Sequence, residues 1–365
     1  MQGAVSAQAR TERNFVNPTP IGSATLATTL WLPPLSFPGA RPVVVFLHGH
    51  GFAGRDYDAF AARLAAAGYV VAAPNTALVD GWLQGLDAAA MHEALRLDAL
   101  DATSPLFGRC DVARAGLVGH SMGAANVLRV LAQTSVYRVG IALTPLITPL
   151  EYPPQVATPV LFVACEGDTL TPWRSNLLPV RDRLAASWMS TIWDASGNHL
   201  NPVFRDFAGS MAKDARVFDA TQTVCQGALR RYLTEDASGL DFVVGEAARA
   251  ESLALLVEHR FLQPEHFATV DATSYALHVA GPDGPVLELG SFGRASIPTP
   301  FGELGLDPNY ILIAPGMVVQ SGRVTSLVFP RGPQFAKVSV WFQSLSFDTA
   351  SSLRFGRVLM GELGT

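Results

Sequence analysis

One serine in this chain lies in a sequence setting that favours nucleophilic chemistry. Residues 119–123 read Gly-His-Ser-Met-Gly, a G-x-S-x-G pattern. The apolar run 115–118 before it predicts a short buried strand, and the residues after it place apolar side chains at helical spacing. A sharp turn between a strand and a helix is the setting of a nucleophile elbow, which presents a serine hydroxyl for attack. We therefore predict that Ser121 is a nucleophile rather than a surface serine in a glycine-rich turn.

Two glycine-rich stretches indicate where a developing negative charge would be held. Gly119 and Gly123 leave room for a close approach of strand and helix, and the backbone N–H of Met122 is expected to point at the oxyanion. Residues 48–51 read His-Gly-His-Gly and follow an apolar run, so the N–H of His50 is the expected second donor. The first histidine of that stretch is expected to hold the loop backbone through its ring nitrogens.

A serine hydroxyl needs a general base, and histidine is the usual choice because its pKa lies near neutral pH. In an open parallel sheet, the catalytic groups belong in the loops that follow the strands. His199 lies in such a loop, after the predicted strand 188–193. The other histidines are expected outside the predicted sheet, within a helix, beside the nucleophile or in the oxyanion loop: His259, His266, His278, His92, His120, His48 and His50.

The base must be oriented by a carboxylate, for which three candidates stand near the ends of strands. Asp168 follows the predicted strand 159–164, and its loop is expected to face the histidine loop. Glu166 lies closer to the strand, and Asp194 lies in the histidine's own loop, so both remain alternatives. Asp168 is favoured because its loop faces the histidine loop across the edge of the crevice, and the order serine, aspartate, histidine is the one this architecture uses.

The remaining chemistry-bearing residues suggest a cleft and no metal. Phe52, Trp173 and Trp193 are predicted to line an acyl or aromatic-ester cleft, with a place in the core or at the rim as the alternative for each. His48 and His50 have no third ligand near them in the sequence, so no metal site is expected. No cofactor is expected either.

The elements that must position these residues alternate between strand and helix. Such a rhythm predicts an α/β fold with a doubly wound, mostly parallel sheet. The predicted strands are 24–32, 43–47, 69–73, 115–118, 139–143, 159–164 and 188–193, the last in the sheet. The predicted helices are 56–67, 84–103, the stretch after the elbow, 177–186 and 220–233.

The composition and the hydrophobic pattern of the sequence change near residue 263. Glycine and proline recur beyond it, and short alternating apolar runs replace helical periodicity, which predicts a small antiparallel β-domain. We therefore expect a catalytic domain over 1–262 and a β-rich accessory domain over 263–365. The stretch 246–261 is helix-like and could belong to either side.

Composition excludes several classes of partner. The chain has 365 residues, 49% of them hydrophobic, and a formal charge of −5 without a basic patch. Nucleic acid and anionic membranes are therefore not expected as partners. No window is long enough for a transmembrane helix, and residues 1–15 lack the apolar segment of a secretory signal. The three cysteines lack metal-ligand spacing, and one disulfide between Cys165 and Cys225 is an option if the protein is exported.

Taken together, the motifs of residues 40–235 resemble the α/β-hydrolase superfamily. More narrowly, these residues resemble the branch of that superfamily that contains bacterial cutinases, polyester (PET) hydrolases, chlorophyllase-like enzymes and dienelactone-hydrolase-like esterases. The motifs that carry the resemblance are 44–51, 64–74, 119–123, 166–172 and 197–200. The resemblance implies Ser121 as nucleophile, Asp168 as acid and His199 as base, with His50 and Met122 as oxyanion donors.

Two positions depart from the polyester hydrolases. Those enzymes usually carry Tyr or Phe where His50 stands, and a tryptophan where this chain has Thr144 and Pro145. Both changes argue against a polyester substrate without affecting an esterase. Residues beyond 263 lie outside the match and resemble β-modules appended to exported bacterial proteins, so a secreted location is expected.

The expected function is hydrolysis of carboxylic esters through an acyl-enzyme. Small-molecule esters and polyesters are both candidate substrates. One alternative is an acyltransferase that uses the same triad, and another is a binding or surface module whose β-domain targets a polymer. Neither the acyl and alcohol specificity nor the oligomeric state follows from the sequence.

Overall fold

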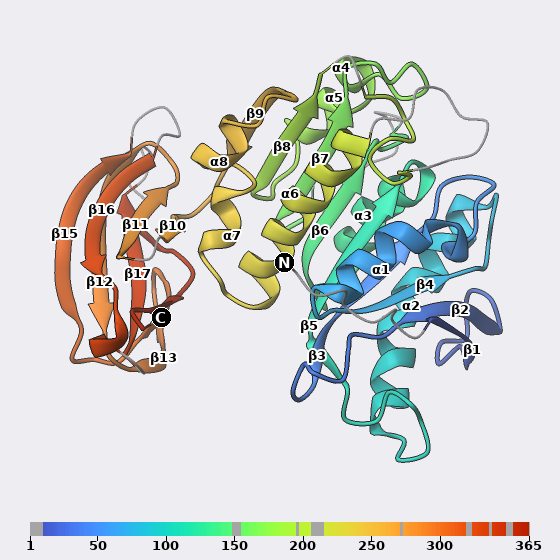
Figure 1. Cartoon of the computed structure of the whole chain (residues 1–365), viewed down its shortest axis with the longest axis horizontal. Coiled ribbons are helices and arrows are strands. Elements are labelled where there is room, and N and C mark those ends of the chain that lie inside the picture. Colours follow the sequence, from blue (N-terminus) through green and yellow to red (C-terminus); the bar gives the residue numbers. More distant parts are fainter. Residues whose placement is uncertain are drawn as a thin grey trace. The chain divides into compact units, whose positions relative to one another are not determined.

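The computed structural model describes residues 10–147, 155–194, 197–205, 215–270, 273–318, 323–335, 338–347 and 353–364. They form two compact units (Figure 1). The first unit draws on residues up to 186 together with 190–226 and 251–257. The second comprises 187–189, 227–250 and the chain from 258 onward. It thus takes in residues 227–250, which the sequence analysis assigned to the N-terminal domain.

A nine-stranded sheet carries the candidate catalytic residues. Its order is β1-β2-β4-β3-β5-β6-β7-β8-β9. The bounds are β1 Arg10–Val16, β2 Thr25–Trp31, β3 Arg41–Leu47, β4 Val70–Pro74, β5 Cys110–His120, β6 Tyr137–Leu143, β7 Val160–Cys165, β8 Trp188–Trp193 and β9 Ala254–Arg260. The neighbouring pairs from β4 to β7 are parallel, whereas β2 pairs antiparallel with both β1 and β4. The predicted α/β fold with a mostly parallel sheet is confirmed.

The central strands are apolar because helices cover both faces of a parallel sheet. In β3 every residue from Pro42 to Leu47 is buried, and β7 is buried along its whole length. The helices of this part are η1 Gly54–Tyr57, α1 Asp58–Ala66, α2 Gly81–Leu100, α3 Met122–Gln133, α4 Trp173–Asn176, α5 Leu178–Arg181 and α6 Ala215–Leu233. In Figure 1 the helices α1, α3 and α6 lie against the sheet.

Three predicted elements differ from the structure. The predicted helix 177–186 is wrong over most of its length, since only α5 and the short α4 before it form. The helix-like stretch 246–261 is also wrong: it divides into α8, Glu246–Arg249, and the strand β9. The sheet edge outweighs helical propensity there, because the Asp194 N–H reaches the Leu253 carbonyl at 2.7 Å. Strand β8 is therefore not the last of the sheet.

The second unit is built from short antiparallel strands, as the sequence predicts. Its sheets have the orders β10-β11-β16, β15-β12-β17-β18 with β19 on β17, and β13-β14. The bounds are α7 Ser238–Asp241, β10 Glu265–Val270, β11 Ser274–Ala280, β12 Gly284–Ser291, β13 Arg294–Thr299, β14 Gly302–Leu306, β15 Ile311–Val318, β16 Arg323–Pro330, η2 Pro333–Phe335, β17 Ser339–Phe347, β18 Leu353–Phe355 and β19 Leu359–Glu362. Every strand pairing recorded in these three sheets is antiparallel.

A buried ion pair connects the helical and β-strand parts of the second unit. The guanidinium of Arg231, near the end of α6, lies 2.6 Å from a carboxylate oxygen of Glu265 on β10. Both side chains are at most 1% exposed. A second carboxylate, that of Glu288, contacts His266 at 2.9 Å and Ser344 at 2.5 Å inside the same unit.

Candidate active site

The serine of the G-x-S-x-G motif stands between β5 and α3 in a strained backbone conformation. Strand β5 ends at His120 and α3 begins at Met122, which leaves Ser121 as the residue before the helix. Its φ is +55°, a region that non-glycine residues rarely adopt. The hydroxyl makes no hydrogen bond to the helix end, so it does not act as an N-cap. This is the geometry that the sequence predicts for a nucleophile elbow.

The glycines flanking this turn are required by close backbone contacts. A Cβ on Gly119 would lie 2.4 Å from the carbonyl oxygen of Gly123. A Cβ on Gly123 would lie 2.3 Å from the Leu47 carbonyl and 2.6 Å from that of His48. The helix therefore begins directly against the end of β3, which places the 48–51 loop beside the start of α3.

The base and acid expected from the sequence form a direct pair. The ring Nδ1 of His199 lies 2.8 Å from Oδ2 of Asp168, and both side chains are buried. The other oxygen of Asp168 accepts from the N–H groups of Leu170 and Thr171, each at 2.9 Å. The Thr171 hydroxyl adds a hydrogen bond to Oδ2 at 2.6 Å. The carboxylate is therefore held from all sides with one oxygen aimed at the imidazole.

Electrostatics favour an ionised acid at this position. Burial alone would raise the pKa of Asp168, but its hydrogen bonds from His199 and Thr171 outweigh burial and hold the pKa below the usual value. An ionised carboxylate accepts the Nδ1 proton of His199 and leaves Nε2 without a proton. That tautomer is the one a general base needs.

The base loop is held against the elbow by contacts to the main chain of His199. Its carbonyl oxygen accepts from Nε2 of His120 at 3.1 Å and from the hydroxyl of Thr144 at 3.2 Å. The rings of His120 and His199 lie 4.9 Å apart, centroid to centroid. Since His120 directly precedes Ser121, base and nucleophile come from adjoining loops. Among the described residues, the Ser121 hydroxyl has no side-chain hydrogen bond, and such contacts often tighten only when substrate binds.

The two backbone groups expected to hold an oxyanion lie on adjoining elements. Met122 is the first residue of α3, so its N–H has no acceptor within the helix. His50 is exposed, in the loop that follows β3. Gly51 completes that turn with φ +75°, and its N–H bonds to the Leu78 carbonyl at 2.8 Å. The oxyanion role of both N–H groups stays a prediction.

The buried histidine of the oxyanion loop has the structural role expected for it. The ring nitrogens of His48 lie 2.9 Å from the Gly49 carbonyl and 3.0 Å from the Thr76 carbonyl. Burial lowers the pKa of His48 despite these contacts. The amide of Gln84 lies over the same ring and also donates to the His48 carbonyl at 3.0 Å. The loop is thereby joined to the chain after β4 and to α2.

The carboxylate of Glu166 is engaged elsewhere, and Asp194 takes part in its loop through its main chain. The carboxylate of Glu166 takes the Trp173 indole N–H at 2.5 Å and the Arg174 guanidinium at 2.5 Å. Asp194 accepts the Gly197 N–H on its main-chain carbonyl, at 3.1 Å. The carboxylate that contacts His199 is that of Asp168.

The structure corrects one of the three aromatic residues assigned to the cleft. Trp193 is 1% exposed, and its indole N–H donates to the Thr221 hydroxyl at 2.9 Å within the core, so it is a packing residue. Trp173 is held by Glu166 and is about as buried as Ser121 and His199, so its place in the cleft stays a prediction. Phe52 is half-buried and lies 5.2 Å from the ring of Phe204, so it stays a candidate.

Sequence reasoning missed a set of exposed apolar residues around the serine. Leu78 and Val79 lie in the loop before α2, and Trp82 lies in its first turn. Leu146 follows β6, and Leu170 follows Asp168. Trp82 is 65% exposed and Leu170 63%. The set adjoins the site, since Leu146 bonds to the Ser121 carbonyl through its N–H and Gly81 lies against the Met122 side chain. Their position directly after predicted strands was the available signal.

None of the three cysteines forms a disulfide, so the pairing considered for Cys165 and Cys225 is absent. Both are buried, and burial raises the pKa of Cys225 well above its usual value. Within the described part of the chain, no three His, Cys, Asp or Glu side chains gather as metal ligands would. The same residues include no helix long and apolar enough to cross a membrane.

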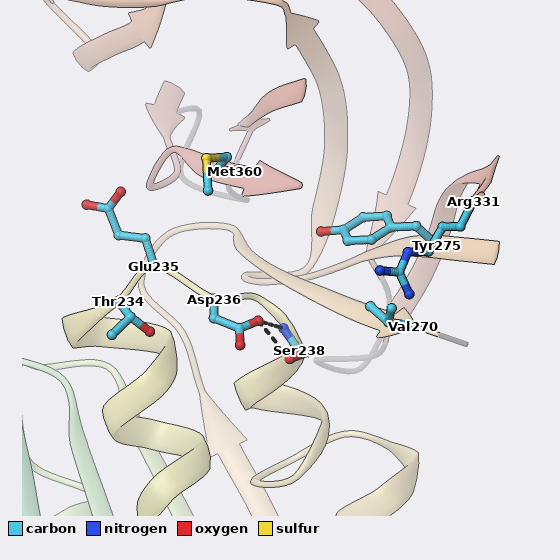
Figure 2. A pocket seen from close by; sticks show the side chains of 8 residues that line it. All are labelled: Thr234, Glu235, Asp236, Ser238, Val270, Tyr275, Arg331 and Met360. Atoms are coloured by element: carbon cyan, nitrogen blue, oxygen red, sulfur yellow. Dashed lines mark hydrogen bonds between the residues drawn. The ribbon is translucent and has the colours of Figure 1, made fainter. Parts of the chain in front are cut away.

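A cavity of about 320 Å³ in the second unit is lined by different chemistry. Figure 2 shows Asp236 and Ser238 joined by a hydrogen bond on one side and Tyr275 and Arg331 on the other. Its lining contains a serine but no histidine, and the Ser238 hydroxyl donates to Asp236 at 2.7 Å. This serine therefore has no base beside it, and the cavity does not compete with the sheet edge as a hydrolytic site.

Comparisons with known proteins point to ester hydrolases. The model of a family described as PET hydrolase-like matches residues 31–249. The bis(hydroxyethyl) terephthalate hydrolase of Streptomyces coelicolor is 34% identical over 125 residues, 34% of this chain and 39% of that protein. Cutinase est1 of Thermobifida alba is 30% identical over 34% of this chain and 42% of that cutinase. Cutinase 1 of Thermobifida cellulosilytica is 28% identical over 38% of this chain and 53% of that protein. The chain thus spans about two fifths to one half of these curated relatives.

Proposed function

The chain belongs to the PET hydrolase-like family, and we propose that it is a serine hydrolase that cleaves carboxylic esters, polyesters included, through an acyl-enzyme. The observation that carries the proposal is the buried His199–Asp168 pair, 2.8 Å apart, beside a serine with φ +55° at a strand–helix turn. A nucleophile, a base and an orienting acid in one place are what acyl transfer requires.

In the first half of the reaction, the Ser121 hydroxyl attacks the ester carbonyl carbon while Nε2 of His199 takes its proton. The tetrahedral oxyanion is held by the N–H groups of His50 and Met122. When the bond to the alcohol oxygen breaks, the imidazolium returns the proton to that oxygen and the alcohol leaves. Asp168 stabilises the imidazolium and fixes its tautomer without taking the proton itself.

In the second half, water replaces the alcohol. His199 removes a proton from water as its oxygen attacks the acyl carbon. Collapse of the second tetrahedral state breaks the bond to Ser121, which recovers its proton from the imidazolium. The products are the free acid and the original enzyme.

The surface around the serine supports an apolar substrate. Leu78, Val79, Trp82, Leu146 and Leu170 are all at least 39% exposed there, and apolar side chains gathered on a surface mark binding sites. Hydrocarbon or aromatic ester segments fit such a rim better than charged ones. The names of the relatives, a terephthalate-ester hydrolase and cutinases, support the same substrate class. A polyester surface would contact several of these side chains at once.

The test is acid release measured in a pH-stat for the wild type, Ser121→Ala and Ser175→Ala. The panel runs from short-chain nitrophenyl esters to solid aromatic polyester. Ser175 is an exposed serine whose hydroxyl bonds to the Pro172 carbonyl, so its loss should leave activity unchanged. We expect Ser121→Ala to lose all turnover above background while keeping the fold. Hydrolysis by a folded Ser121→Ala protein would refute the proposal.

Two alternatives are separated by the same assay. An acyltransferase would divert product to an added alcohol, so the ratio of ester to acid products would rise with alcohol concentration. A binding module without hydrolytic function would release no acid from any ester. Extracellular location stays a prediction, and the oligomeric state needs its own measurement.

A further inference from the structure

A chain of hydrogen bonds crosses the first unit beneath the candidate site. The N–H of Gly49 donates to the phenol oxygen of Tyr57 at 2.8 Å. The same oxygen lies 2.8 Å from Nδ1 of His120. The other nitrogen of that ring, Nε2, lies 3.1 Å from the carbonyl oxygen of His199. The chain therefore runs from the loop that holds one oxyanion donor to the main chain of the base.

With a neutral His120, only one arrangement of protons satisfies all three bonds. A carbonyl oxygen can only accept, so Nε2 of His120 must carry a proton and donate it to the carbonyl oxygen of His199. Nδ1 is then an acceptor, and the Tyr57 hydroxyl donates to it. The phenol oxygen in turn accepts from the N–H of Gly49. Every bond points the same way, and a charged imidazolium would reverse the middle one.

The surroundings keep this arrangement fixed. Tyr57 and His120 are both fully buried, and burial lowers the pKa of His120 to about 3, so the ring stays neutral. The ring of Phe204 packs 4.8 Å from that of Tyr57. A Cβ on Gly49 would lie 2.9 Å from Nδ1 of His120, so only glycine lets the loop approach this closely.

We propose that Tyr57 and His120 are positioning residues that set the distance between the oxyanion loop and the general base. Neither has a hydrogen bond to the Ser121 hydroxyl or to the ring nitrogens of His199 among the described residues, and His120 bonds to the main chain of the base. They act by holding Gly49, the neighbour of His50, and the main chain of His199 at the two ends of one rigid connection. The inference rests on the proposed function, because it assigns a role relative to that nucleophile and base.

The positioning role predicts that loss of one buried hydroxyl lowers the rate of chemistry. Tyr57→Phe removes the central group of the chain and leaves its packing in place. Tyr137→Phe is a matched control, because Tyr137 is 1% exposed and its hydroxyl donates to the Ala88 carbonyl at 3.0 Å, at the start of β6 away from the site. We expect Tyr57→Phe to lower kcat on a soluble nitrophenyl ester by about 10- to 100-fold with KM within twofold, as small displacements of catalytic groups do.

Stability separates positioning from a general loss of structure. Tyr57→Phe removes two buried hydrogen bonds and Tyr137→Phe removes one, so Tyr57→Phe should lose more stability in urea unfolding, up to about twice as much. Tyr137→Phe should keep the wild-type kcat. If both variants kept the wild-type kcat, or lost activity equally, the positioning role of Tyr57 would be wrong.

Two substitutions of His120 test whether the groups act as one connection. An asparagine amide reaches about as far as Nδ1 and a glutamine amide about as far as Nε2, so His120→Asn keeps the Tyr57 end and His120→Gln keeps the His199 end. Because a serial connection is severed by a break at either end, adding Tyr57→Phe should lower kcat little further in either background. Independent, multiplicative effects in both backgrounds would overturn the proposal.

The inference can fail without the proposed function failing. If Ser121→Ala is inactive and Tyr57→Phe behaves like Tyr137→Phe, the enzyme is a serine hydrolase without this connection. If Ser121→Ala keeps the wild-type rate, the proposed function itself is wrong, and the positioning role falls with it.

Discussion

Asp168 differs from the neighbouring acidic residues in what its two carboxylate oxygens contact. One oxygen is fixed by two backbone N–H groups and the other faces Nδ1 of His199. Glu166 instead holds an indole and a guanidinium. Two acids near one sheet edge therefore have different tasks, and only the local contacts distinguish them.

The first prediction at this scale concerns the proton on His199. Asp168→Asn keeps the shape of the side chain but turns an amide toward Nδ1, which favours the wrong tautomer of the base. We expect kcat/KM to fall by about three to four orders of magnitude on a soluble ester. Asp194→Asn is the matched control, since Asp194 lies in the loop of the histidine. Full activity in Asp168→Asn, or an equal loss in Asp194→Asn, would contradict the assignment.

The second prediction concerns stability in acid. The folded protein keeps His120 neutral down to about pH 3, whereas the unfolded chain takes up a proton below about pH 6.5. The unfolded state thus binds more protons between these values, and stability falls as pH is lowered from 6.5 toward 3. From pH 7 to pH 5 the loss due to His120 is about 2 kcal/mol.

Urea unfolding at pH 7 and pH 5 measures this loss. His120→Gln lacks the titrating ring, whereas all other acidic and basic groups are shared with the wild type. The wild type should therefore lose about 2 kcal/mol more than His120→Gln over the same interval. An identical pH dependence for both proteins would show that His120 is not the group responsible.

Residue-level prediction from the sequence worked where chemistry fixes local backbone geometry. The elbow motif located Ser121, and loop order located His199 and Asp168, whose contact the structure then provides. It did not find His120 or Tyr57, because their roles depend on contacts 63 and 79 residues apart in the chain. It misplaced Trp193, because a strand buried on both faces hides every side chain whatever its type.

At the scale of elements, the packing of α3 against β3 sets the geometry of the elbow. Gly123→Ala would place a Cβ 2.3 Å from the Leu47 carbonyl. Helix and strand must then move apart, which we expect to cost about 1–3 kcal/mol of stability and most of the activity. Gly85→Ala is the control: it lies within α2 with 3.6 Å to the nearest atom, Oδ1 of Asn126.

The control should change stability in the opposite direction. Alanine in a helix interior gains about 0.5–1 kcal/mol over glycine when its Cβ has room. Thermal unfolding and ester hydrolysis of both variants test the pair. An active and stable Gly123→Ala protein would mean that the contact between α3 and β3 can relax without moving the oxyanion loop.

The strands were more predictable than the helices. Buried parallel strands are continuous apolar runs, and the predicted 43–47, 139–143, 159–164 and 188–193 match β3, β6, β7 and β8 within a few residues. The helix-like periodicity near 246–261 led to a wrong helix prediction, because an edge strand such as β9 also carries Leu, Val and charged residues. Pairing at a sheet edge is a tertiary contact that propensity does not contain.

At the scale of the whole molecule, the boundary between the two units does not coincide with the change of hydrophobic pattern near residue 263. Residues 227–250 belong to the second unit, and the Arg231–Glu265 ion pair is one contact that holds them there. No feature of composition marks this, since the change in periodicity comes only after residue 260. Helical periodicity predicted α6 correctly but could not show that its last turns pack with the β-strands.

That ion pair provides a prediction for the second unit. Arg231→Met leaves the fully buried Glu265 with Arg357, 3.9 Å away, as its remaining partner. We expect a loss of about 3–5 kcal/mol in chemical unfolding followed by tryptophan fluorescence. The double variant Arg231→Met, Glu265→Leu should recover most of it, because no unpaired charge then remains.

An exposed pair in the same unit is the control. Arg294 and Glu235 lie 3.5 Å apart with about half of the arginine side chain exposed, so Arg294→Met should cost less than about 1 kcal/mol. Equal losses in Arg231→Met and Arg294→Met would mean that the buried pair contributes nothing special to the unit.

The absence of disulfides has a consequence for how the protein can be produced. No cross-link has to form during folding, so an oxidising periplasm and a disulfide isomerase are unnecessary. Burial raises the pKa of Cys110 to about 12, which leaves little of this thiol as the reactive thiolate at neutral pH. Expression in a reducing cytoplasm should yield the same melting temperature as expression with export, and added dithiothreitol should not change it.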